Sequence, residues 1–172
     1  MAKRQLEYFG TVNFTKYKTR MKKRTILSMI AAAFLSLTSY SQSSVQQTDF
    51  LGAPADLKEY KVVYQLDNDD EKSIKMTLRN IQNALDDPRL KSKLKVELVV
   101  HGAGIAAFMN TSSYGEQFKY LMSEGVILAQ CMNTMRERNI TKDKLYDFIS
   151  FVPSGNGELI IRQQQGWAYI HP

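Results

Sequence analysis

Cysteine is nearly absent from this chain, whose 172 residues contain a single one, Cys131. One cysteine cannot form an internal disulfide, so an apolar core must hold the fold. In an exported protein an unpaired cysteine is a reactive thiol or forms an intermolecular bridge, and the alternative is a buried packing residue. Histidine occurs twice, without ligand-like spacing, so we expect no metal site.

Long apolar runs are lacking as well, since a bilayer-spanning helix needs about 20 apolar residues. The apolar stretch 26–37 is shorter, and it follows Lys22, Lys23 and Arg24. This layout predicts a secretory signal peptide over residues 21–41, cleaved after Ser41, with an uncleaved anchor as the alternative.

The predicted signal peptide also bears on the status of residues 1–20 and on the location of the mature protein. Residues 1–20 form a doubtful extension, because Met21 can serve as the start. After cleavage we expect a periplasmic or secreted protein with no stable membrane insertion. No cysteine lies near the cleavage site, so a lipid anchor is not expected.

Positive charge is concentrated in the leader. Residues 1–41 contain eight Lys/Arg and one acid, so they carry +7 of a chain whose net charge is +6, and the remainder carries −1. No basic surface remains for a nucleic acid, and we expect no nucleic-acid partner.

Strand-like and helix-like segments alternate after a flexible tether over 42–58, which predicts one domain over 59–172. We expect strands at 60–66, 96–101, 126–130, 148–152 and 167–170. We expect helices at 74–85, near 118–122, from 131 to about 139, at 141–146 and at 158–165, with turns at 102–104 and 153–157. This order predicts an α/β fold of three layers, with a mostly parallel five-stranded sheet and helices on both faces.

Ligands of such folds bind beyond the carboxyl ends of the strands. The candidates there are Cys131 for catalysis, His101 as a helper, and a ligand-binding set of Asn68, Gly102, Gly104, Ser154 and Gly155. Cys131 ends the third strand and begins a helix, where backbone N–H groups favour a thiolate. His101 is a candidate base or hydrogen-bond donor, with a backbone-satisfied histidine as the alternative. His171 is expected to be structural or free.

Several stretches together resemble the DsrE/DsrF-like family of sulfur-handling proteins. They are residues 60–66, 99–104 and 125–135, followed by Val152-Pro153-Ser154-Gly155. The resemblance implies a YchN-like three-layer α/β domain that assembles into homotrimers or homohexamers. It also implies that Cys131 accepts sulfur as a persulfide from a donor protein and passes it to an acceptor. The family's sulfur-relay members work in the cytosol, whereas this chain has the layout of an exported protein.

Three other motifs have ordinary alternatives. Gly102-x-Gly104-x-x-Ala107 matches a dinucleotide fingerprint loosely, but it follows the second strand, and we expect no cofactor. Ser154–Gly157 is either an anion cradle or a plain turn before a helix. The acidic run 67–71 is either a weak cation site or a solvated helix start.

Two classes of function remain open. The first is a thiol-based sulfur carrier, or sulfurtransferase accessory, that uses Cys131. The alternative is a non-catalytic oligomeric module that binds a small ligand, or a structural protein with the same fold.

Overall fold

The computed structural model describes residues 50–172. The predicted extension 1–20, the signal peptide 21–41 and most of the tether lie outside the described residues. The last part of the tether, residues 50–58, has no helix or strand. No helix in the described part has the length and apolar composition needed to cross a bilayer.

Five strands form one sheet, and every pairing in it is parallel. They are β1 (Tyr60–Leu66), β2 (Leu94–Val100), β3 (Ile127–Cys131), β4 (Ser150–Val152) and β5 (Ala168–Ile170), in the order β4-β3-β2-β1-β5. The predicted five-stranded α/β sheet is therefore confirmed, and it is wholly parallel.

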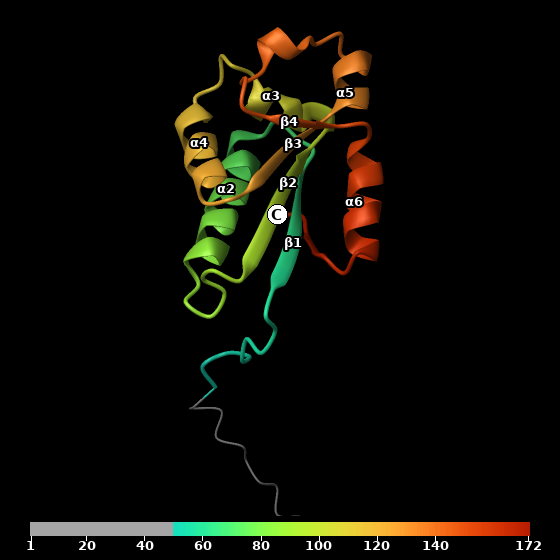
Figure 1. Cartoon of the computed structure of the whole chain (residues 1–172). Coiled ribbons are helices and arrows are strands. Elements are labelled where there is room, and N and C mark those ends of the chain that lie inside the picture. Colours follow the sequence, from blue (N-terminus) through green and yellow to red (C-terminus); the bar gives the residue numbers. More distant parts are fainter. Residues whose placement is uncertain (1–49) are drawn as a thin grey trace, which may run out of the picture. The chain divides into compact units, whose positions relative to one another are not determined.

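Helices cover both faces of the sheet (Figure 1). On one face lie α2 (Glu71–Asp86), α3 (Ile105–Phe108) and α4 (Gly115–Ser123), and their buried side chains join Val62, Tyr64 and Leu66 of β1 in the larger core. On the other face lies α6 (Gly155–Gln164), whose Leu159 packs against Val63, Val99 and Ala129. The alternation of β1 residues between the two cores is what the two-residue period of a strand requires.

Helix α2 shows how local sequence sets an element's ends. The Asp70 carboxylate accepts a hydrogen bond from the Ser73 N–H at 2.8 Å, which caps the helix. The helix starts three residues before the predicted Ile74 because of this cap. It ends before Pro88, since the residue that precedes a proline avoids helical geometry.

Helix α6 corrects the prediction of a turn over 153–157. The Ser154 hydroxyl accepts a hydrogen bond from the Gly157 N–H at 3.2 Å, so the helix begins at Gly155 rather than at Glu158. The sequence did not indicate this start, because the first turn contains two glycines and glycine is common in turns.

Smaller corrections concern short elements. The expected loop 102–104 is a 3₁₀ turn that continues into α3, and the expected helix 141–146 is a single 3₁₀ turn at Lys142–Lys144. The expected helix from 131 to about 139 is α5 (Met132–Glu137). Helix α4 ends before Gly125, as expected, because Gly125 has a φ of +87°.

Candidate functional site

The carboxyl ends of the strands form a small concavity of about 170 Å³. Its walls come from the end of β2, the start of α5 and the start of α6. The lining residues are His101, Gly102, Cys131, Asn133, Thr134, Glu137, Ser154, Gly155 and Asn156. At about 30 Å³ per water molecule, this space holds a ligand of only a few heavy atoms.

The structure brings most of the predicted site residues to this concavity. His101, Gly102, Cys131, Ser154 and Gly155 all line it. Two members of the predicted ligand-binding set do not, because Asn68 and Gly104 serve other contacts in the fold.

Cys131 is 4% exposed and is the residue that precedes the first turn of α5. Burial raises the pKa of its thiol. Donors that face the sulfur lower the pKa by more, so the net pKa lies below the ordinary value. These donors are the backbone N–H of Thr134, the N–H of Gly155, the Thr134 hydroxyl and the N–H of Asn133. The thiolate is therefore stabilised from two sides, by the starts of α5 and α6.

Cys131 makes no regular capping hydrogen bond to α5. Hydrogen bonds from the N–H groups of Asn133, Thr134 and Gly155 lower the pKa of the sulfur, and the dipoles of these groups favour the thiolate as well. A dipole that is fixed in the fold needs no rearrangement when a charge develops on the sulfur.

His101 packs directly against the start of α6. A side chain at Gly155 would bring its Cβ to between 3.0 and 3.2 Å from carbon atoms of His101, so the glycine makes room for the ring. Burial lowers the pKa of His101, and His171 lowers it further, whereas Asp67 raises it; the net pKa is below the ordinary value. The ring is consequently neutral near pH 7, and its Nε2 atom is buried without a hydrogen-bond partner.

Gly102 and Gly104, the two glycines of the loose fingerprint match, lie where two backbone segments approach closely. Gly102 has a φ of +55°, and a Cβ there would lie 2.9 Å from the carbonyl oxygen of Asp67. At Gly104 a Cβ would lie 2.4 Å from the carbonyl oxygen of Leu66. Contact with the end of β1 therefore accounts for both glycines without any bound dinucleotide.

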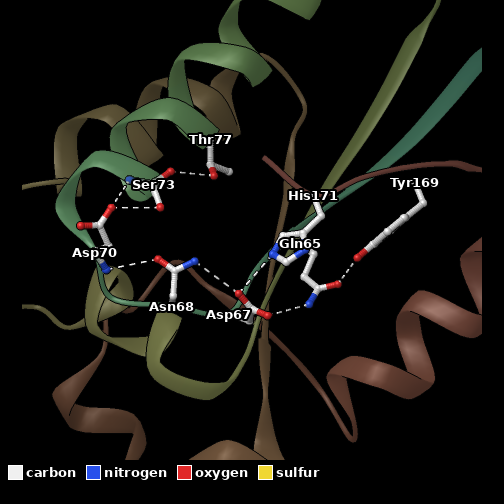
Figure 2. Close-up of polar contacts among 8 residues, drawn as sticks. All are labelled: Gln65, Asp67, Asn68, Asp70, Ser73, Thr77, Tyr169 and His171. Atoms are coloured by element: carbon white, nitrogen blue, oxygen red, sulfur yellow. Dashed lines mark hydrogen bonds and ion pairs between the residues drawn. The ribbon is translucent and has the colours of Figure 1, made fainter.

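A polar network covers the end of β1 (Figure 2). The Asp67 carboxylate accepts hydrogen bonds from the side-chain amides of Gln65 at 3.1 Å and Asn68 at 3.4 Å, and it contacts His171 Nε2 at 3.1 Å. The Tyr169 hydroxyl also contacts the Gln65 side chain. Tyr169 and His171 thus tie the C-terminal segment to the end of β1, whereas Asn68 contacts its neighbours Asp67 and Asp70.

The acidic run after β1 behaves as a solvated helix start. Asp70 caps α2, and the Asn68 side chain accepts a hydrogen bond from the Asp70 N–H at 3.2 Å. Among residues 50–172, no three His, Cys, Asp or Glu side chains are grouped to hold a metal ion.

The chain matches the DsrE/DsrF-like family over residues 61–172, which include the whole concavity. It belongs to that family. Comparison with curated proteins gives no match.

Two solved structures are similar to this chain and support the DsrE/DsrF-like fold. The protein of unknown function MTH1491 from Methanobacterium thermoautotrophicum is 33% identical, with a TM-score of 0.63, and the match covers 66% of this chain and all of the other. The ychN protein of E. coli is 14% identical, with a TM-score of 0.55 and coverage of 67% and 100%. At that identity, the ychN match shows the fold alone.

Sequence reasoning missed Thr134, Asn133 and Glu137 in this DsrE/DsrF-like site, whereas Asn156 lies within the candidate cradle 154–157. A signal for Thr134 was present, since it lies three residues after Cys131 at the start of a helix. Residues at that spacing contact each other across a helix N-terminus.

Gly104→Ala tests the close approach between the 102–104 turn and β1. The new Cβ would meet backbone that cannot move away, so we expect a loss of roughly 1–3 kcal/mol in the free energy of unfolding, measured by urea denaturation. Gly157→Ala is the matched control, because its Cβ would meet only the Ser154 side chain, at 3.2 Å and beyond. Equal stability of the two variants would contradict the close approach.

Proposed function

We propose that this DsrE/DsrF-like protein is a thiol-based sulfur carrier in which Cys131 holds sulfur as a persulfide. One observation carries the proposal: the single cysteine lies in a polar concavity where donors from two helix starts lower its pKa. A buried packing cysteine needs no such donors, because burial alone favours the neutral thiol.

The proposed step is a transfer of one sulfur atom from a small persulfide or polysulfide, written R–S–SH. The Cys131 thiolate attacks the terminal sulfur and forms a new S–S bond. The bond between the two donor sulfurs breaks, and its electron pair leaves with the thiolate RS⁻. The products are the Cys131 persulfide and RS⁻, so charge and atoms balance. The size of the concavity favours a small donor, or the tip of a donor side chain.

His101 is the proposed helper in this step. Its ring lines the same concavity and is neutral near pH 7, so one ring nitrogen carries a proton and the other accepts one. A hydrogen bond from this ring to the departing thiolate would favour the breaking of the donor bond. The proposed role of His101 therefore concerns the donor rather than the attacking sulfur.

The alkylation rate of Cys131, followed against pH by intact mass, tests the proposal. Because the pKa is lowered, the rate should rise at a lower pH than for an ordinary thiol, whose pKa is about 8.5. In a separate sample that has not been alkylated, exposure to polysulfide should add the mass of one sulfur atom to the protein.

Cys131→Ser is the control, and it should neither react nor gain sulfur. A thiol that reacts only after denaturation, without any sulfur gain, would overturn the carrier proposal. The concavity would then belong to a binding or structural member of the family.

We also propose that the domain self-associates through α6 and β5. Ile160 is 61% exposed and Ile161 is 52% exposed on α6, and Tyr169 is exposed on the neighbouring β5, where it lies beside Val63 on the α6 face of the sheet. Strand β5 is an edge of the sheet, so one row of its backbone groups is unpaired. Adjacent exposed apolar side chains of this size are typical of interaction surfaces.

Light scattering coupled to size-exclusion chromatography tests the assembly. The wild type should be a homotrimer or homohexamer at micromolar concentration, and Ile161→Lys should reduce its mass toward that of a monomer. Tyr120→Lys alters an exposed aromatic residue on α4, across the sheet, and should leave the assembly intact. A monomeric wild type would remove this proposal.

Export is the third part of the proposal and rests on the leader pattern of residues 21–41. The protein recovered from the periplasm of producing cells should begin at Gln42, as read by N-terminal sequencing. Ser41→Tyr should block cleavage, because the site requires a small residue there. Recovery of the uncleaved chain from the cytosol would contradict export.

A further inference from the structure

Thr134 has a placement that the sequence alone does not explain. It is 4% exposed, lies in the first turn of α5 and lines the same concavity as Gly102 and Cys131. A buried hydroxyl needs hydrogen-bond partners, since leaving it without them costs free energy.

The acceptor side of this hydroxyl is already occupied. The Gly102 N–H donates a hydrogen bond to Thr134 Oγ1 at 2.9 Å. Gly102 is held in place by its left-handed backbone and by its approach to the carbonyl of Asp67. The 102–104 turn therefore fixes the position of the oxygen, and the hydroxyl proton remains free to be donated elsewhere.

Thr77 in α2 shows the usual use of such a proton. It is equally buried, and its hydroxyl donates to the carbonyl oxygen of Ser73, four residues earlier, at 2.9 Å. In the described part of the chain, the Thr134 hydroxyl donates no hydrogen bond of ordinary geometry to a backbone carbonyl or to another side chain, and it lines the same concavity as Cys131. The carbonyl of Cys131, three residues before Thr134, instead accepts the side-chain amide of Gln130 at 3.0 Å.

We propose that Thr134 is a positioning residue, in which the Gly102 N–H orients the hydroxyl so that it donates its proton to the Cys131 sulfur. The hydroxyl is one of the groups that stabilise the thiolate of Cys131. The 102–104 turn thereby sets the reactivity of a cysteine on the next strand. This inference rests on Cys131 being the reacting group of the proposed function.

The test compares Thr134→Val with Thr134→Ser by titration of the thiolate's ultraviolet absorbance, which does not require a reagent to reach the sulfur. Cys131→Ser supplies the blank. Valine has the shape of threonine without the hydroxyl, so the titration midpoint of Cys131 should rise by about one pH unit. Serine keeps the hydroxyl and should restore the wild-type midpoint. Thr134→Ala replaces the valine variant if that one does not fold.

Thr77→Val is the matched control for a purely structural effect. It removes a buried hydroxyl from α2 and should lower stability in urea while leaving the midpoint of Cys131 unchanged. If Thr134→Val also loses stability without a change of midpoint, Thr134 only holds the turn and the inference is overturned. A midpoint equal to that of an ordinary thiol in the wild type would overturn it as well.

Sulfur loading is read separately, by intact mass after exposure to polysulfide. A shifted midpoint without sulfur gain would support the role of Thr134 and defeat the carrier proposal. Sulfur gain with the same midpoint in the wild type and in Thr134→Val would support the carrier proposal and overturn the role of Thr134.

Discussion

Parallel pairing in register places Leu66 opposite Val100, Val100 opposite Gln130, and Cys131 opposite Val152. The site depends on this register, because the carboxyl ends of the parallel strands then lie at the same edge of the sheet. The β1 end supplies the Asp67 carbonyl against which Gly102 packs, the β2 end supplies His101 and the glycine turn, and β3 ends on the cysteine. A shift of one residue in β3 would turn Cys131 to the opposite face of the sheet and away from α6.

Two opposing effects meet at the sulfur, and the structure decides between them. Burial disfavours a thiolate, whereas N–H groups and a hydroxyl that face the sulfur favour it, and the second effect is larger. The donors come from α5 and α6, two helices separated by a loop and by strand β4. Their convergence therefore depends on the sheet, and the reactivity of Cys131 is a property of the whole fold.

The sequence predicted the parts of this arrangement that follow from periodicity and failed where contacts between distant segments decide. Strand β1 was expected with its observed bounds, since its apolar residues and the polar run after it are local signals. The start of α6 was missed, because Gly155 and Gly157 favour a turn and only the Ser154 cap reverses this preference. Helix α3 was also missed, since four residues are too short to show a helical period.

The candidate site likewise includes residues that the sequence placed correctly and residues that it did not. Cys131 and His101 were placed by counting strand ends, which the chain order alone permits. Asn68 was assigned to ligand binding on the same argument, but its side chain turns to Asp67 and to the Asp70 N–H. Gly104 was assigned to ligand binding because it follows a strand end, whereas its contact with the Leu66 carbonyl requires knowledge of which backbone lies opposite. Side-chain direction and close approach are three-dimensional facts that a linear pattern does not contain.

A buried ion pair under α6 shows why this helix can serve the site. Glu97 of β2 is 1% exposed and contacts Arg162 Nε at 2.5 Å, and Arg162 also contacts Glu158 at 2.9 Å. Arg162 stacks over the Trp167 ring at 4.5 Å. Burial raises the pKa of Glu97, although Arg162 opposes the rise, so the pair contributes little net stability.

Such a pair tolerates few alternative positions, because a displaced helix would leave a buried charge without a partner. Arg162 lies near the end of α6, and Gly155 lies at its beginning, beside the sulfur. Fixing the far end of a rigid helix fixes the direction of its first N–H groups. The ion pair on the sheet and the thiolate at its edge are thus joined by one helix, which links the packing of the fold to the chemistry proposed for Cys131.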